Sequence, residues 1–334
     1  MKIDDVAAAL GISKATVSRA ITGHGRISPA TRELVVNYME AHDFHPNTIA
    51  QSLSKRKTMN IAFTVPTGKE FTQLPFFLQC LVGATGRAAD HSYDTLVVNN
   101  SYTDVKRVVD QSKIDAVIVS RNVVGSRMLG YLTSTGLPFI LIGTTAQKSV
   151  LQVDHDHRSA CRELTRMLLD QWKGTPGLLA GSNAHLVSRA RAQGFKDAAG
   201  AAPVVWGAID EPSVVAGFDQ LLQQGVDIVF CEDDMICGYL EKHLRTSDPG
   251  VGRSAIRVAS FYDSPMLQAL NPEVPVLHFD AVELGARACS MVLAALAGET
   301  PDNAILDYEI MMHGHSRAST THRQDTRPTM KGKQ

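Results

Sequence analysis

From Asn60 onward the sequence alternates short apolar runs with longer amphipathic stretches, and this order indicates the fold class. The apolar runs are rich in β-branched residues and are continuous, which is typical of strands covered on both faces. Strands that alternate with helices form parallel sheets, so we predict an α/β fold. The predicted strands are Ile61–Val65, Thr95–Val98, Ala116–Val119, Phe139–Ile142, Leu178–Ala180, Val204–Trp206, Ile228–Cys231, Ile256–Ala259 and Val276–His278.

Amphipathic stretches between these runs are predicted to be helices that cover the sheets. They include Phe77–His91, Ser159–Trp172, Ser213–Gln224, Asp233–Leu244 and Val282–Leu296. The stretch from residue 60 to 312 is long enough for two open sheets, and therefore for two lobes. Ligands of open α/β sheets bind outside the carboxyl ends of the strands, so we expect a small-molecule site between the lobes.

The first 45 residues differ from the rest, because their apolar residues recur at the spacing of three short helices. Gly11 separates the first helix from the second, which we expect from about residue 14 to 21. Ser13 can cap the second helix, and Ser28 followed by Pro29 is a strong start for the third. Two short helices joined by a tight turn and closed by a third form a helix-turn-helix module.

In such modules the second helix enters the major groove of DNA with its first turn foremost. Val17 is predicted to point inward, and the outer face is polar. Hydroxyl and amine groups can reach phosphates, an arginine can bond a guanine edge twice, and an alanine can touch a thymine methyl. The alternative is a small helical domain whose polar face has no role. The outward residues are Lys14, Ala15, Thr16, Ser18 and Arg19.

The net charge of −1 conceals an uneven distribution. Residues 1–60 hold eight basic and five acidic side chains, residues 61–312 hold 20 and 28, and residues 313–334 hold five and one. Basic ends on an acidic body are compatible with nucleic-acid binding. No apolar run approaches the ~18 residues that span a bilayer, so no membrane partner is expected. Five widely spaced cysteines favour a reducing, cytoplasmic setting over a disulfide framework.

The N-terminal motifs, in order and spacing, resemble the start of the lactose/galactose repressor (LacI/GalR) family of bacterial transcription regulators. The matching segments are DVAAALGISKATVSRAITG, ISPATRELV and FHPNTIAQSLSKRKTMNIAF, over about 60 residues. Lys2, where the family usually has a capping threonine, and Phe44, where it commonly has tyrosine, are departures. The resemblance implies a DNA-binding repressor that forms a homodimer on a near-palindromic operator. No leucine heptads occur in the polar tail, which favours a dimer over a tetramer.

Between the head and the body, Pro46 ends the third helix and a short segment follows. The resemblance implies that this segment is a hinge helix that pairs with its twin and opens the minor groove, with Leu53 as the wedge between base pairs. A flexible linker is the alternative. We expect Lys14, Ala15 and Arg19 to select the DNA sequence. The residues expected to hold phosphates are Lys2, Ser18, Asn47 and Lys55. The remaining DNA-binding candidates are Ser13, Thr16, Ala50 and Leu53.

The body resembles the periplasmic-binding-protein-like core of the same family, more loosely. The matching pieces are ILIG near residue 140, VDHD at 153–156, ARAQGF at 190–195, CEDDMICG at 231–238, SFYDS at 260–264 and HFDAVELG at 278–285. The resemblance implies an effector cleft. Arg191 and Asp233 are its best-supported residues, because they lie in the clearest of these motifs. An interlobe salt bridge or a helix cap is the alternative for these two. The implied cleft residues are Pro75, Phe76, Ser120, Arg121, Gly143, Arg191, Asp233, Tyr262 and Phe279.

Departures from the family pattern bear on the effector. Gly143 and Tyr262 stand where the family often has aspartates that grip sugar hydroxyls, and Glu232 stands where it often has asparagine. Arg121 joins Arg191 in the implied cleft, and His278 lies just before its rim. A cleft with fewer acids and more cations suits an anionic carbohydrate-like effector, such as a sugar acid or a sugar phosphate.

The implied domains are the helix-turn-helix head at 1–46, a hinge at 47–58, a two-lobed core at 59–312 and a tail at 313–334. Lobe 1 would take residues 59–154 and 281–307, and lobe 2 residues 155–280 and 308–318. The run Asp154-His155-Asp156-His157 resembles a metal site, but neighbouring side chains point in different directions, so we expect no metal and no cofactor. An enzyme and a constitutive architectural DNA binder remain as alternatives, although no paired acid and base or activated nucleophile is evident.

Overall fold

The computed structural model describes residues 1–22, 25–44, 57–66, 75–122, 126–246 and 256–312, and the backbone of 316–318. The chain separates into two compact units, Met1–Thr58 and Met59–Gln334. Each has its own apolar core. No helix within the described ranges is both long and apolar enough to cross a membrane.

The first unit is a three-helix head formed by α1 (Ile3–Leu10), α2 (Lys14–Thr22) and α3 (Pro29–Ala41). Its core centres on Val6, Val17 and Val35, which are fully buried. Gly11 ends α1 with φ of 65°, a conformation that glycine adopts without strain. The Ser28 hydroxyl accepts a hydrogen bond from the Thr31 amide at 3.1 Å and caps α3. The predicted helix-turn-helix head is therefore confirmed.

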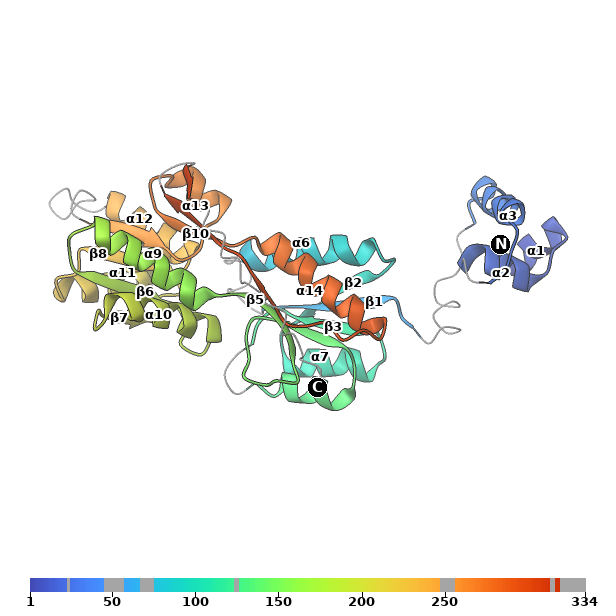
Figure 1. Ribbon diagram of the computed structural model, residues 1–334, viewed down its shortest axis with the longest axis horizontal. Helices are drawn as coiled ribbons and strands as arrows, with labels where there is room; N and C mark the ends of the chain where they lie inside the picture. The colour runs from blue at the N-terminus through green and yellow to red at the C-terminus, as the bar shows by residue number, and fades with distance from the viewer. Residues whose placement is uncertain are drawn as a thin grey trace, which may run out of the picture. The chain divides into compact units, whose positions relative to one another are not determined.

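Lobe 1 of the second unit is built on a six-stranded sheet in the order β11-β5-β4-β3-β1-β2, and every pair of neighbours is parallel (Figure 1). The strands are β1 (Asn60–Val65), β2 (Asp94–Asn99), β3 (Ala116–Val119), β4 (Phe139–Ile142), β5 (Leu151–His155) and β11 (Ala304–Leu306). The helices are α6 (Pro75–Ala89), α7 (Tyr102–Asp110), α8 (Met128–Thr135) and α14 (Ala281–Leu296). Continuous apolar strands are buried on both faces, as a parallel sheet requires.

Lobe 2 contains a seven-stranded sheet in the order β13-β12-β10-β9-β8-β6-β7. Its strands are β6 (Pro176–Ala180), β7 (Val204–Trp206), β8 (Ile228–Cys231), β9 (Arg257–Ser260), β10 (Val276–His278), β12 (Glu309–Met312) and β13 (Ser316–Ala318). Its helices are α9 (His157–Gln171), α10 (Leu186–Ala199), α11 (Glu211–Gln223), α12 (Asp234–Thr246) and α13 (Pro265–Leu270). The sheet is parallel apart from β12, which runs antiparallel to β10 and β13.

The structure confirms the predicted α/β class with parallel sheets, and each predicted strand lies within two residues of an observed one. Four described strands of the body, β5, β11, β12 and β13, were not predicted. In β5, Gln152, Asp154 and His155 interrupt the apolar run, so its sequence does not look like a buried strand. β11 is a three-residue edge strand, too short for a periodic signal.

The chain passes between the two sheets of the body three times: from β5 to α9, from β10 to α14 and from β11 to β12. These three crossings bring residues that are far apart in sequence to the border between the lobes. The ring of His155 in the first crossing lies 4.8 Å from the ring of Phe279 in the second, and its Nδ1 donates to the Asp307 carbonyl in the third, at 2.9 Å.

Candidate functional site

The α2 helix presents the outer face that the sequence predicts. Lys14, Ala15 and Arg19 are exposed, and Val17 is buried in the core of the head. The Ser13 hydroxyl accepts from the Thr16 amide at 3.1 Å, so it begins α2 by capping its first turn. Thr16 and Ser18 lie on the same helix and are half-buried. Ser18 also interacts with another group of the protein.

Two further details concern the start of the head. The Lys2 amide donates to the Asp5 carboxylate at 2.6 Å, and the Lys2 side chain makes no capping hydrogen bond. Lys14 Nζ lies 2.9 Å from Asp4 Oδ2, and both side chains are exposed. An exposed ion pair is weak, so Lys14 can exchange Asp4 for another anion at little cost. The hinge candidates Asn47, Ala50, Leu53 and Lys55 lie outside the described residues.

A cavity of about 260 Å³ opens between the lobes of the body. It lies at the carboxyl ends of the central strands, where open α/β sheets bind ligands. Seven of the nine predicted cleft residues line it: Phe76, Ser120, Arg121, Gly143, Arg191, Asp233 and Tyr262. Pro75 and Phe279 are outside its lining. Pro75 is the first residue of α6, and Phe279 is 1% exposed behind Tyr262, with 6.4 Å between the two ring centres.

Arg191 projects from α10 and is 8% exposed. Its Nη1 donates to the Glu232 carbonyl at 2.9 Å. The guanidinium carbon lies 5.8 Å from the ring centre of Tyr262 and 5.9 Å from that of Phe279. Nε is buried and, within the described part of the chain, has no hydrogen-bond partner. The two aromatic rings therefore hold the guanidinium in place, and its Nε–H can donate to a ligand.

The two aspartates that follow β8 have different surroundings. Asp233 Oδ1 accepts from the Ile236 amide at 2.9 Å and caps α12. Burial raises the pKa of Asp233. Burial, with the nearby charge of Asp233, also raises the pKa of Asp234 to about 7. Asp234 Oδ1 is buried and unpartnered among the described residues, so it is the carboxylate best placed to bind a hydroxyl.

Glu232, which departs from the family pattern, is 4% exposed. Its Oε2 accepts from the Gly181 amide at 2.6 Å, and its Oε1 accepts from the Ser188 hydroxyl. Burial raises the pKa of this carboxyl, and its hydrogen bonds oppose that rise. The side chain thus joins the end of β6 to α10 and is occupied by protein donors.

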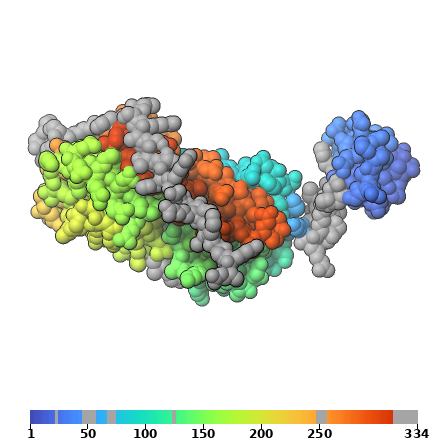
Figure 2. Space-filling view, in the orientation of Figure 1, coloured from blue at the N-terminus to red at the C-terminus, as the bar shows by residue number. Residues whose placement is uncertain are grey.

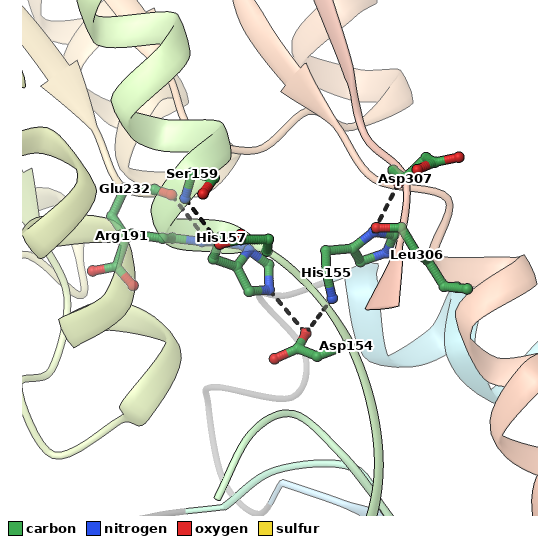
Figure 3. Close-up of polar contacts among 9 residues, drawn as sticks. Asp154, His155, His157, Ser159, Arg191, Glu232, Leu306 and Asp307 are labelled. Carbon is green, nitrogen blue, oxygen red and sulfur yellow. Dashed lines mark hydrogen bonds and ion pairs between the residues drawn. The ribbon is translucent and has the colours of Figure 1, made fainter. Parts of the chain in front are cut away.

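The first crossing, from β5 to α9, also contributes to the cavity, and this was not predicted from the sequence. Asp154 and His157 both line it, and His157 Nε2 donates to Asp154 Oδ1 at 3.1 Å (Figure 3). The amide of His155 donates to the same oxygen at 2.9 Å. Burial lowers the pKa of His155 to about 4, so this imidazole is neutral near pH 7. The VDHD motif at residues 153–156 could have indicated this segment. It does not show which of its side chains face the cavity.

The metal-like run is thus an internal hydrogen-bond cluster. In the described ranges no group of three or more His, Cys, Asp or Glu side chains is arranged to hold a metal ion. His278, expected near the cleft rim, is outside the cavity lining and lies 3.0 Å from Asp263 Oδ2 through its Nδ1. His185 was also missed, and it lines the cavity at the start of α10.

These features define a class: a helix-turn-helix head on a two-lobed α/β body with an interlobe cavity. The model of the LacI family of bacterial regulatory proteins matches residues 2–47. The model of periplasmic binding proteins and the sugar-binding domain of the LacI family matches residues 60–211. The chain belongs to the LacI/GalR family of DNA-binding transcription regulators.

Individual relatives agree with this assignment. The transcriptional regulator MalR of Staphylococcus xylosus is 30% identical over 176 residues, which is 51% of this chain and 52% of that protein. The regulator CelR of Thermobifida fusca is 23% identical over 335 residues, or 93% of this chain and 96% of CelR. A Lac repressor dimer bound to operator and the anti-inducer ONPF matches with a TM-score of 0.79 at 19% identity, over 95% of this chain and 98% of that one. At such identity the structural match shows the shared fold.

Proposed function

We propose that this protein represses carbohydrate or sugar-acid catabolic genes. A homodimer would bind a near-palindromic operator in the bacterial cytoplasm, and a carbohydrate-like effector in the interlobe cavity would release it. Relatives support the two halves of this proposal. A solved structure of CelR is a complex with cellobiose, and a solved Lac repressor dimer is bound to its operator.

The observation that best supports the effector role is a set of buried polar atoms without partners around the cavity. Within the described residues these include Ser120 Oγ, Arg191 Nε and Asp234 Oδ1. A buried polar group left unsatisfied costs about 1–3 kcal/mol, so a ligand that supplies partners gains from each. A hydroxyl, which both donates and accepts, can satisfy all three kinds of atom. We therefore infer a polyhydroxylated ligand.

Release requires that the effector bind one arrangement of the lobes better than the other. The cavity is lined by both lobes, so a bound ligand contacts both and stabilises one relative placement. We propose that this placement separates the hinge segments and weakens operator binding. The cavity then binds its ligand without transforming it, and turnover of a bound sugar by the purified protein would contradict this part of the proposal.

Arg19 provides a direct test of the DNA-binding role. If its guanidinium bonds a guanine edge, Arg19→Ala relaxes discrimination at one base pair by about 1–3 kcal/mol. Operator variants at each position should be compared by gel shift for the wild type and the variant. A matched control is Arg32→Ala, which removes the same charge from α3. Equal weakening on all operator variants would instead show that Arg19 contacts phosphate.

A further inference from the structure

We propose that the cavity binds an amino sugar, a polyhydroxylated ligand whose protonated amine pairs with the carboxylate of Asp234. This inference rests on the proposed effector role and deepens it by naming the class of ligand. It differs from the anionic effector that the cleft motifs favour. The reason is that the fold brings to the cavity acidic side chains, Asp154, Asp210 and Asp234, that the implied cleft does not include.

The lining of the cavity holds more acidic than basic charge. Among the described residues, its basic side chains are Arg121, Arg191, His157 and His185. Its carboxylates are Asp154, Asp210, Glu232, Asp233 and Asp234. When Asp154 and His157 are counted as one pair, four carboxylates remain against two guanidinium groups. Hydrogen bonds from amides and hydroxyls satisfy carboxylate oxygens without supplying an opposite charge. A cavity with such an excess of acids favours a cationic ligand.

The three consecutive carboxyl groups that follow β8 show the same imbalance. Burial raises the pKa of each, and the charge of Asp233 adds to the rise for Glu232 and Asp234. Arg191 and Arg121 oppose the rise for Asp233. In the described chain, the influences that oppose the rise for Asp234 are hydrogen bonds, foremost that of Ser264, and not a basic side chain. A ligand cation beside Asp234 favours its ionised form and thereby gains binding free energy.

Asp234 also has an oxygen to which a cation can bind. Its side chain lines the cavity and is 5% exposed. A hydrogen bond with Ser264 engages the carboxyl group, whereas Oδ1 is buried and has no partner among the described residues. Asp233, by contrast, accepts from the Ile236 amide and caps α12. A buried acceptor without a partner indicates a ligand donor, and a protonated amine supplies up to three.

The wall of the cavity beside Asp234 is largely apolar, which strengthens an ion pair formed there. Burial raises the pKa of Tyr262 and the charge of Asp234 adds to the rise, so the two side chains are near each other. Phe76 packs edge-on against Tyr262 with 5.8 Å between the ring centres, and both rings line the cavity. Met235 and Ile236 line it as well. Opposite charges attract more strongly where water is excluded, and aromatic rings attract cations.

Other groups of the cavity are left for the hydroxyls of the ligand. Ser120 Oγ in lobe 1 and Arg191 Nε in lobe 2 are buried and unpartnered within the described residues, and both side chains line the cavity. A hydroxyl can accept from Arg191 and can either donate to Ser120 or accept from it. One site for an amine and two for hydroxyls are the chemistry of an amino sugar.

The test uses the full-length protein with glucosamine, galactosamine and mannosamine as probes, at constant ionic strength and about pH 7, where an amine is still mostly protonated. Each amino hexose is compared with its N-acetyl derivative and its neutral hexose, and gluconate serves as the anionic probe. Titration calorimetry and thermal shift measure binding by the wild type, Asp234→Asn and Asp219→Asn. Asp219 is an exposed aspartate on α11 of the same lobe, so Asp219→Asn is the matched control.

We expect at least one amino hexose to bind the wild type and the control about 10-fold or more tightly than its N-acetyl derivative and its neutral hexose. Asp234→Asn should weaken the binding of that amino hexose by about 10- to 100-fold. Failure of all three amino hexoses to bind would overturn the proposal, and so would tighter binding of the neutral hexoses or of gluconate. Undiminished amine binding by a folded Asp234→Asn protein would also overturn it. If that variant does not fold, the wild-type comparison of each amine with its uncharged partners decides.

The proposed regulatory role fails by a different result. If an amino hexose binds as expected and the protein retains no fragment of genomic DNA, the ligand class stands and the repressor role is wrong. If a neutral sugar releases the protein from its operator and no amino hexose binds, the regulator stands and the ligand class is wrong.

Discussion

For single residues, burial and local partners determine what a charged side chain can do. Glu232 and Asp234 are two positions apart and are both buried, with 4% and 5% of their surface exposed. Glu232 is occupied by Gly181 and Ser188, whereas Asp234 retains a buried oxygen without a partner in the described chain. Both are carboxylates in a single acidic motif, and the sequence does not distinguish them. Their long-range neighbours do.

The His278–Asp263 pair gives a prediction about pH at this scale. The hydrogen bond to Asp263 raises the pKa of His278, and partial burial opposes the rise. A raised pKa means that the folded state binds the proton more tightly than the unfolded state. The pair therefore stabilises the fold fully below the unfolded pKa of about 6.5, and this contribution is lost as the pH rises through the folded pKa.

We expect His278→Gln to lower the free energy of unfolding at about pH 5.5 by up to roughly 1 kcal/mol, since the histidine is partly exposed. At about pH 9 the loss should be smaller, because the imidazole is then neutral in both states. Urea unfolding at the two pH values measures the difference. Asp263→Asn should remove the same pH dependence, and equal losses for His278→Gln at both pH values would refute the role of the ion pair.

For whole elements, the close packing of α6 on α14 shows what a sequence conceals. The two helices lie side by side in lobe 1 (Figures 1 and 2). A Cβ added to Gly83 would lie 1.9 Å from the carbonyl oxygen of Val282, and one added to Gly285 would lie 1.9 Å from that of Cys80. The helix backbones are therefore in direct contact, and a methyl group at either glycine must push them apart.

We expect Gly83→Ala to destabilise the body by about 1–3 kcal/mol or more, because the clash is with backbone that cannot rotate away. Gly86→Ala is the matched control on the same helix. Nothing lies within 4 Å of a Cβ at Gly86, so alanine there should be neutral or stabilising, by up to about 1 kcal/mol. Chemical denaturation of the two variants measures the contrast. Similar stability of both would show that the helices separate without cost.

For the whole molecule, the chain divides into two units, and each unit has its own apolar core. The head has a small core around Val6, Val17 and Val35, and the body has its own clusters in the two lobes. A domain of about 60 residues buries a modest fraction of its surface and is marginally stable. Loss of one core side chain therefore removes a large part of the stability of the head.

Val17→Ala tests this division. Loss of the buried side-chain volume should destabilise the head by about 2 kcal/mol and weaken operator binding, while the melting of the body and its ligand binding remain unchanged. Calorimetry of the wild type and the variant separates the transitions of the two units. A shift of the body transition by Val17→Ala would show that the units unfold together.

The sequence predicts those parts of the site that depend on residues close together in the chain, and not those that depend on distant segments. The face of α2 was predictable, because helical spacing places Val17 inside and Arg19 outside within one turn. The position of Phe279 was not. Its motif placed it at the cleft, but the crossings between lobes bury it behind Tyr262. Which ring faces the cavity depends on how three distant segments pack together.

The sequence by itself determined the alternation of strands and helices, the capping of α2 and α3 by Ser13 and Ser28, and hence the fold class. Those are properties of short segments, set by side-chain periodicity and by local hydrogen bonds. Only the tertiary structure brought Arg121 to His185, which are 64 positions apart and belong to different lobes. Contacts of this kind depend on where strand ends meet after the sheets assemble, and no local pattern encodes that position.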